Sequence, residues 1–114
     1  MSPAEPPPRR GEVWWISFDP SIGGEIRKMR PAIIVSNDSA NRYLNRVQVV
    51  PLTSNVERLY PAEAYVSVNG VRNKAMADRI TTASKQRLRN KIGQLVSADL
   101  TGVERAIKIQ LGQS

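Results

Sequence analysis

The chain has 114 residues and carries 17 Lys and Arg against 10 Asp and Glu, a formal net charge of +7, and its length favours a single domain. It contains no cysteine and no histidine, which excludes disulfides, thiolate chemistry and every mechanism that uses histidine as a base or metal ligand. The longest apolar run, residues 31–35, is far shorter than the ~20 residues of a membrane-spanning helix.

The N-terminal segment is rich in proline. Residues 1–9 hold four of the eight prolines, and such segments favour extended, unpacked backbone. We therefore predict a disordered tail over residues 1–9 and one folded domain over residues 10–114. The first residues also lack the apolar stretch of a secretory signal, so we expect a cytoplasmic protein with no membrane partner.

Short β-branched or alternating segments predict strands. They are residues 12–19, 33–35, 47–50, 64–68, 75–82 and 89–94. The Asn69-Gly70 pair predicts a tight hairpin turn, and residues 37–43 and 85–88 are expected to form helical turns. Gly23 and Gly24 indicate a mobile loop over residues 20–29.

One longer helix is predicted near the C-terminal end. Its apolar stripe consists of Leu100, Val103, Ile107 and Leu111, with Ser97 as N-cap and Gly112 as the closing residue. The stripe would cover a sheet face or a dimer seam. Short strands with one terminal helix predict a mainly β fold with added helices (α+β), specifically a small antiparallel β-barrel with a C-terminal helix.

Basic residues gather in two stretches. The first comprises Arg27, Lys28, Arg30, Arg42 and Arg46, and the second comprises Arg72, Lys74, Arg79, Lys85, Arg87, Arg89 and Lys91. Each stretch could follow a phosphate backbone, and a small basic domain favours a nucleic-acid partner. The alternative is two solvated faces that serve solubility alone.

Arg30 stands before Pro31, directly after the predicted glycine loop. Proline biases the preceding residue toward extended backbone. The guanidinium would then be held at a strand end, where it can stabilise charge on a phosphate. The alternative is a structural ion pair with Glu25 or Asp19.

Few other residues offer chemistry. Thr53 and Ser54 end a predicted strand, and their hydroxyls can either donate to phosphate oxygens or form a turn. Acidic residues are scattered, and neither a phosphate-binding glycine loop nor a dinucleotide motif is present. We therefore expect neither a metal ion nor a cofactor.

Six segments occur in a specific order. They are Arg10–Ile16, Phe18–Pro20, Gly24–Glu25, Arg30–Asn37, Val49–Ser54 and Asp78–Ile80. In this order they resemble the MazF/PemK ribonuclease toxins, over residues 9–112. The resemblance implies an SH3-like barrel that forms homodimers and cuts single-stranded RNA, commonly mRNA, at short sequences without a metal ion. The ribose 2′-OH would attack, leaving a 2′,3′-cyclic phosphate and a 5′-OH. A cognate antitoxin would silence the enzyme, and we expect it to place an acidic, disordered segment in the basic groove.

The resemblance also assigns roles to residues. It puts the catalytic arginine and threonine on Arg30 and Thr53. The residues expected to contact RNA are Glu25, Arg27, Lys28, Ser54, Asp78 and Arg79. Arg79 stands where glutamine is common in the family and Thr81 where a basic residue is common, which leaves the recognised RNA sequence open.

The neighbouring residues Trp14 and Trp15 are expected to differ in burial and in role. Alternation puts Val13 and Trp15 on one face of the first strand, and we predict that Trp15 is a core residue. Trp14 is left open as a residue that stacks on an RNA base.

Two other functions remain open at this stage. One is a CcdB-like toxin that inhibits DNA gyrase and cuts nothing. The other is a non-catalytic RNA-binding barrel, which would keep the basic faces but would not need Thr53. The combination of Arg30, Pro31 and Thr53 favours the nuclease.

Overall fold

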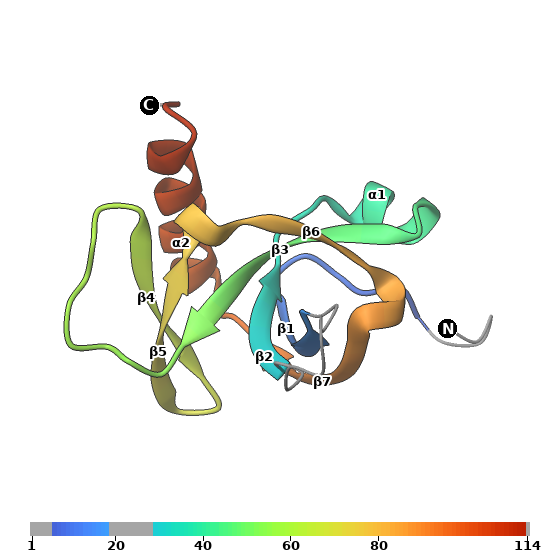
Figure 1. Ribbon diagram of the computed structural model, residues 1–114, viewed down its shortest axis with the longest axis horizontal. Helices are drawn as coiled ribbons and strands as arrows, with labels where there is room; N and C mark the ends of the chain where they lie inside the picture. Colours follow the sequence, from blue (N-terminus) through green and yellow to red (C-terminus); the bar gives the residue numbers. More distant parts are fainter. Residues whose placement is uncertain (1–5, 19–28, 114) are drawn as a thin grey trace, which may run out of the picture.

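A computed structural model describes residues 6–18 and 29–113 of the chain. The elements in chain order are β1 (Glu12–Ser17), β2 (Met29–Ile34), α1 (Asp38–Tyr43), β3 (Arg46–Thr53), β4 (Glu63–Val68), β5 (Val71–Met76), the 3-10 turn η1 (Ala77–Arg79), β6 (Thr81–Ser84), the 3-10 turn η2 (Lys85–Arg87), β7 (Leu88–Gln94) and α2 (Ser97–Gln110). Figure 1 shows α2 beside the β4–β5 hairpin, with the other strands grouped next to them.

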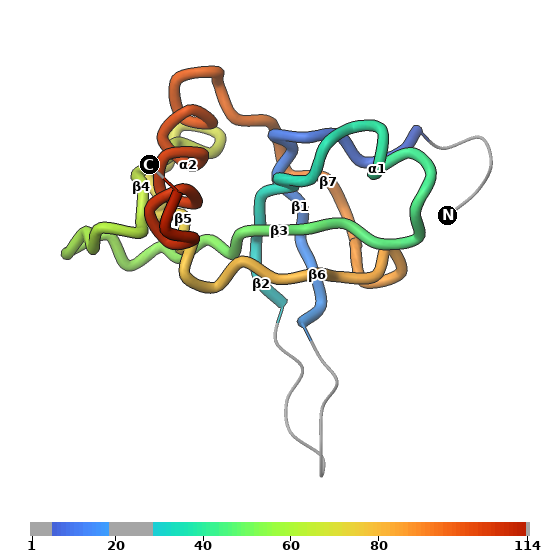
Figure 2. The backbone as a smooth tube through the Cα atoms, turned by 90° about the horizontal axis from the view of Figure 1, so that it is seen from above, coloured from blue at the N-terminus to red at the C-terminus, as the bar shows by residue number. Residues whose placement is uncertain are grey.

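The strands form a strongly bent antiparallel sheet in the order β4-β5-β3-β2-β1-β7, and β6 pairs with β3 outside this path. Strand β3 joins the two parts, because its first half pairs with β6 and its last residues pair with β5. The result is a partly open barrel with a C-terminal helix, which confirms the predicted fold class. Figure 2 shows α2 and the β4–β5 hairpin at one end and α1 at the other.

Two apolar clusters fill the interior. Neighbouring residues of β2 contribute to both clusters, because successive side chains along a strand point to opposite faces. Ile33 packs in the cluster under α2, whereas Ile34 packs in the cluster enclosed by β1, β3 and β6, and both are fully buried. The prediction that this segment is buried on both faces is confirmed. No helix within the described residues is long and apolar enough to cross a membrane.

The β4–β5 hairpin closes as the sequence predicts. Val68 pairs with Val71, which leaves a two-residue turn. Asn69 and Gly70 both have positive φ, at 51° and 81°. This is the combination required by the type I′ turn that matches strand twist.

The segment predicted as one strand over residues 75–82 is divided in the structure. Residues up to Met76 belong to β5, η1 follows, and β6 begins at Thr81. The division follows from the bend of β3, because β5 pairs with its end whereas β6 pairs with its beginning. The chain must pass from the end of β3 to its beginning, and η1 forms this connection.

The C-terminal helix begins differently from the prediction and ends as predicted. Ser97 is its first residue rather than its cap, and the N-cap Val96 supplies no side-chain hydrogen bond. Val103 is buried, but Leu111 lies beyond the helix and is exposed. Gly112 has a φ of 72°, and the amide of Gln113 donates to the carbonyl of Lys108. This is the glycine-dependent Schellman end.

The proline-rich segment is packed at its C-terminal side. Pro8 is fully buried, and the Arg9 amide donates to Glu12 Oε1 at 2.9 Å. The predicted tail over residues 1–9 is therefore wrong for these last positions, because an apolar ring without an N–H fills a core site at no hydrogen-bonding cost. Residues 1–5 lie outside the described residues.

Removal of Pro8 should therefore destabilise the fold. We expect deletion of residues 2–8 to cost about 1 kcal/mol or more from lost apolar burial, and to lower Tm by ~5 °C. Deletion of residues 2–5 is the matched control and should leave Tm unchanged. Thermal unfolding followed by circular dichroism measures both, and equal Tm values for the two deletions would contradict the role of Pro8.

Candidate active site

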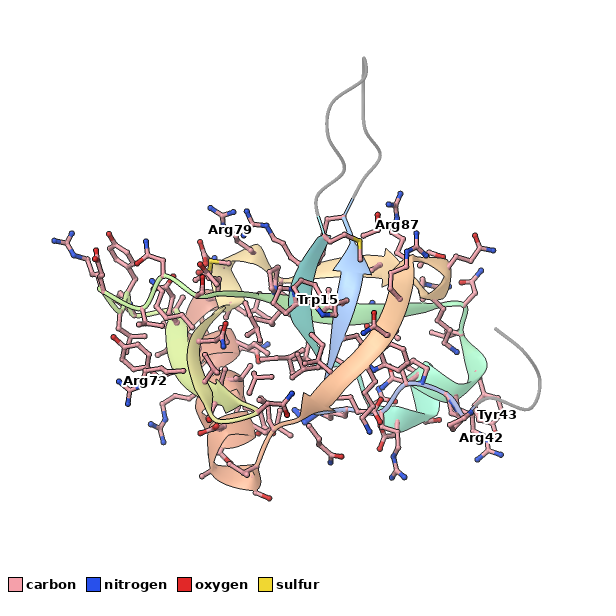
Figure 3. All side chains as sticks on the ribbon, turned by 90° about the horizontal axis from the view of Figure 1, so that it is seen from below. Trp15, Arg42, Tyr43, Arg72, Arg79 and Arg87 are labelled. Atoms are coloured by element: carbon pink, nitrogen blue, oxygen red, sulfur yellow. The ribbon has the colours of Figure 1, made fainter. Side chains whose placement is uncertain are left out.

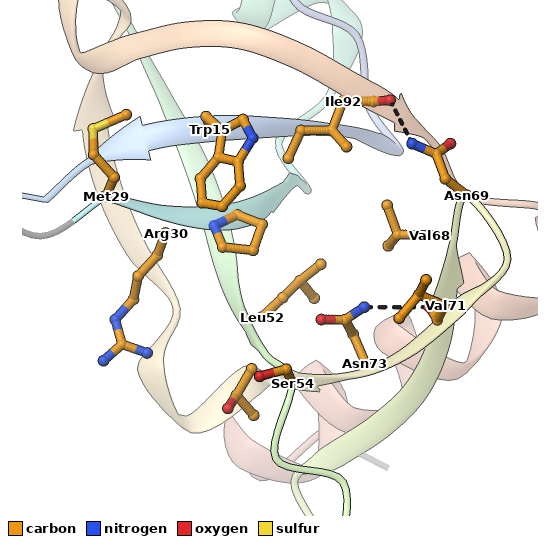
Figure 4. A pocket seen from close by; sticks show the side chains of 12 residues that line it. Trp15, Met29, Arg30, Leu52, Ser54, Val68, Asn69, Val71, Asn73 and Ile92 are labelled. Atoms are coloured by element: carbon orange, nitrogen blue, oxygen red, sulfur yellow. Dashed lines mark hydrogen bonds between the residues drawn. The ribbon is translucent and has the colours of Figure 1, made fainter.

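An open cavity of about 770 Å³ lies between β1, β2, the end of β3 and the β4–β5 hairpin. Its lining consists of Trp15, Met29, Arg30, Pro31, Leu52, Thr53, Ser54, Val68, Asn69, Val71, Asn73 and Ile92. Figure 4 shows Arg30 at one side of this cavity and Ser54 and Asn73 across from Trp15. Arg30 is the one charged side chain among the described residues that line it.

The cavity opens where two paired strands part. The β2–β3 ladder includes the pair Ala32–Pro51, and beyond it β3 turns to pair with β5 through Leu52 and Thr53. Pro51 has no N–H with which to extend a ladder. If the β2–β3 register continued by two residues, Arg30 would stand opposite Thr53. Arg30 and Thr53 both line the cavity at the point where the two strands part.

Thr53 is oriented by a short turn. Its Oγ1 accepts a hydrogen bond from the Asn55 amide at 3.2 Å. The hydroxyl proton has no acceptor within the part of the chain that the structure describes. Because the Thr53 hydroxyl oxygen only accepts in this bond, its proton is available for a hydrogen bond to a phosphate oxygen.

Arg30 also borders a second, smaller hollow of about 220 Å³. Arg79 and Thr81 line this hollow together with Phe18, Pro51 and Met76. Arg79 therefore lies next to the larger cavity but does not line it. The two arginines give this end of the sheet a positive charge that suits a phosphate chain.

The structure brings together only part of the predicted RNA-contacting set. Ser54 lines the cavity with the proposed catalytic pair, and Arg79 lines the neighbouring hollow. Asp78 is exposed on η1 and lines neither. Glu25, Arg27 and Lys28 lie outside the described residues.

The two predicted basic stretches do not form two continuous surfaces. Arg72 and Arg87 of the second stretch lie at opposite sides of the view in Figure 3, and Arg42 of the first stretch lies on α1, away from the cavity that Arg30 lines. Lys74 is buried in an ion pair, and Lys91 pairs with Glu12 at 3.1 Å. Closeness in sequence did not predict closeness in space here, because the bent sheet places successive strands on different sides of the molecule.

The prediction that Trp15 is a core residue is wrong. Trp15 does lie on the same face of β1 as Val13, as predicted. However, α2 covers only the Val13 end of that face, and Trp15 is 37% exposed in the cavity. Across the sheet it pairs with Pro31. Trp14 points to the other face, packs against the second cluster and donates its Nε1 proton to Glu12 at 3.0 Å.

Two amide side chains were missed as candidates. Asn69 and Asn73 line the cavity, and they donate to the carbonyls of Ile92 and Val71 (Figure 4). Amide groups read the hydrogen-bonding edges of bases in single-stranded RNA. The turn signal at Asn69 located the hairpin, but only the folded sheet shows that this hairpin forms a wall of the cavity.

The described residues contain no group of three or more acidic side chains that could hold a metal ion. The donor set of the cavity consists of a guanidinium, hydroxyls and amides. The guanidinium binds and stabilises anionic oxygens, and the hydroxyls and amides can donate to them as well.

Residues 9–111 match the family of PemK-like, MazF-like toxins of type II toxin-antitoxin systems. The chain belongs to this family. The match spans all of the elements described above, including both strands that carry the proposed catalytic pair.

Individual relatives of this PemK/MazF-like toxin agree with the family. Endoribonuclease MazF9 of Mycobacterium tuberculosis is 38% identical over 112 residues, covering 90% of this chain and 95% of that protein. A MazF crystal structure from Deinococcus radiodurans has a TM-score of 0.80 at 25% identity, covering 96% of this chain and all of that one. A mycobacterial endoribonuclease in complex with its cognate antitoxin has a TM-score of 0.78 at 27% identity, covering 94% and 97% of the two chains.

Proposed function

We propose that this toxin cuts single-stranded RNA in the open cavity, using Arg30 and Thr53 and no metal ion. The observation that supports this most is that both residues line one cavity at the point where β2 and β3 part. The endoribonuclease relatives favour this function over a gyrase inhibitor or a non-catalytic RNA-binding barrel.

The proposed reaction is an internal transfer at phosphorus. The 2′-oxygen of the ribose forms a bond to the adjacent phosphorus while the bond to the 5′-oxygen of the next nucleotide breaks. The proton of the 2′-OH is lost to water, and the departing 5′-oxygen gains one. The products are a 2′,3′-cyclic phosphate and a 5′-OH.

Arg30 supplies electrostatic stabilisation in this scheme. The pentacoordinate intermediate carries extra negative charge on its non-bridging oxygens, and a guanidinium donates two parallel hydrogen bonds to such oxygens. Because a guanidinium offers hydrogen-bond donors and no acceptor, Arg30 is assigned to charge stabilisation. Thr53 donates to a non-bridging oxygen or positions the 2′-OH.

The rest of the cavity is suited to hold the bases. The exposed face of Trp15 offers a stacking surface, and the amides of Asn69 and Asn73 offer donors and acceptors. Arg79 extends the positive charge beyond Arg30. We assign the remaining RNA contacts to Ser54, Asp78, Glu25, Arg27 and Lys28, and the RNA sequence that the toxin prefers is expected to depend on them.

The proposed partners are an antitoxin and a second copy of the chain. The net charge of +7 complements an acidic disordered segment, which would fold into the cavity and exclude RNA. The solved complex of a mycobacterial relative with its cognate antitoxin supports this partner. We propose a homodimer because the family resemblance implies one.

The test is cleavage of a long RNA of mixed sequence in excess EDTA. We expect discrete cuts whose upstream ends carry 2′,3′-cyclic phosphate and whose downstream ends carry 5′-OH, because every group in the proposed scheme belongs to the protein or the RNA. Mapping the ends chemically identifies both the products and the preferred sequence.

Loss of cleavage in EDTA with recovery in Mg²⁺ would contradict the metal-free scheme. A folded protein that binds the RNA and leaves it intact would favour the plain RNA-binding barrel. A protein that neither binds nor cuts RNA but blocks DNA supercoiling would favour gyrase inhibition.

A further inference from the structure

Residues 54–62 form a long connection that begins directly after Thr53 and ends at β4. Three hydrogen bonds that involve a side chain tie it to the β4–β5 hairpin at every second residue. These are Tyr65 Oη to the Val56 carbonyl at 2.9 Å, Lys74 Nζ to the Arg58 carbonyl at 2.6 Å, and the Tyr60 amide to Glu63 Oε1 at 2.9 Å. Side chains of the hairpin therefore hold the middle of this connection, while backbone bonds from the amides of Glu63 and Ala77 hold its end at the carbonyls of Tyr60 and Ala62.

Lys74 is the centre of this attachment. It is only 7% exposed, and its Nζ donates both to the Arg58 carbonyl and to Glu63 Oε1, the latter at 2.9 Å. The ammonium also lies 5.5 Å from the centre of the Tyr60 ring. Buried lysines are rare and costly unless paired, so this one needs an explanation.

Glu63 completes the pair. Burial acts to raise the pKa of its carboxyl, but hydrogen bonds from Lys74 and the Tyr60 amide, with the charges of Lys74 and Arg79, bring the pKa below its usual value. Glu63 therefore stays ionised at neutral pH. One of its oxygens accepts from both the lysine and the connection itself.

Lys74 is also the cross-strand neighbour of Thr53 in the β3–β5 ladder. We infer that Lys74 and Glu63 form a positioning pair, which fixes the connection over residues 54–62 and thereby aims the Thr53 hydroxyl into the cavity. The inference rests on the proposed function and adds two residues that touch neither the RNA nor the reacting atoms.

The path from the pair to the hydroxyl is short. Thr53 Oγ1 accepts from the Asn55 amide, which belongs to the connection, and Asn55 Oδ1 in turn accepts from the Glu57 amide. The hairpin holds this stretch at two carbonyls, that of Val56 through Tyr65 Oη and that of Arg58 through Lys74 Nζ. Without Lys74, the Tyr65 bond to the Val56 carbonyl is, among the described residues, the one side-chain bond from the hairpin that remains next to the turn that orients Thr53.

A role in stability alone is the competing explanation, and two control variants separate it. Arg10 and Glu104 form another partly buried ion pair, at 3.0 Å, which joins the N-terminal segment to α2. Arg10→Met should lower Tm without affecting the reaction. The double variant Lys74→Met/Glu63→Gln leaves no unpaired buried charge, so it keeps the fold while the Arg58 carbonyl remains unattached.

The experiment measures kcat and KM for a short RNA substrate, together with Tm and amide hydrogen exchange over residues 54–60. We expect Lys74→Met and the double variant to lower kcat by ~10- to 100-fold, the usual effect of a misplaced catalytic group, with KM changed by less than about threefold. Exchange over residues 54–60 should accelerate in both, and Arg10→Met should retain wild-type kcat and exchange.

Suppose that the wild-type protein cuts RNA. If Lys74→Met then keeps the full kcat, or if the double variant recovers it fully, the inference is overturned and the proposed function stays intact. An equal loss of kcat in Arg10→Met would also overturn it, because stability would then be the cause. A wild-type protein that cuts no RNA would overturn the proposed function, and the inference with it.

Discussion

Replacement of Arg30 by alanine is expected to lower the rate of RNA cleavage by about 10³-fold or more, with little change in Tm. Rate losses of this size are typical when an enzyme loses a preorganised donor, especially an arginine, that stabilises the negative charge developing on a phosphate. Arg30 is half-buried near the start of β2, and the apolar core begins two residues further on. Rates under single-turnover conditions with saturating RNA measure the effect directly.

Two further variants sharpen this result. Arg30→Lys keeps the charge but loses the planar pair of donors, so it should recover only a small part of the rate. Arg42→Ala removes an exposed cation on α1, away from the cavity, and should leave the rate unchanged. Equal activity of Arg30→Ala and the wild type would show that Arg30 is not catalytic.

Replacement of Thr53 by valine is expected to lower kcat by about 10²- to 10³-fold, the usual effect of removing one preorganised donor. Valine keeps the branched shape and the β-strand preference, so the strand pair Thr53–Lys74 should persist. The Asn55 amide loses its acceptor, but it lies at an exposed turn where water can replace the bond.

Serine at the same position restores the hydroxyl, so Thr53→Ser should retain most of the activity. The comparison of valine with serine isolates the hydroxyl from the shape of the side chain. If both variants cut RNA at the wild-type rate, the hydroxyl plays no part in the reaction, and Thr53 serves only the turn that it forms with Asn55.

Most of the fold could be predicted from local sequence. Strand alternation, the Asn69-Gly70 turn and the presence of α2 depend on neighbouring residues, and the structure confirms them, although Leu111 of the predicted stripe lies outside the helix. The break at Ala77 between β5 and β6 could not be predicted in this way. It depends on which part of β3 each strand meets, and that choice is made by the whole bent sheet.

The candidate site shows the same division. Arg30 and Thr53 were predicted from motif and resemblance, and the cavity contains both. The exposure of Trp15 was missed, because alternation tells which face a residue occupies but not whether another element covers that face. The burial of Lys74 was also missed, because a lysine in a basic stretch resembles a solvent-exposed cation until its partner Glu63 is located across the hairpin.

The arrangement of the tryptophans gives the toxin two natural optical reporters. Trp14 and Trp15 are its only indoles. Trp15 lines the cavity with Arg30, whereas Trp14 lines a separate hollow with Pro6 and Pro7 on the other side of β1. Phenylalanine in place of either leaves a single indole, which can be excited apart from the three tyrosines. Fluorescence can then distinguish a molecule that enters the cavity from a rearrangement of the N-terminal prolines, without any attached dye.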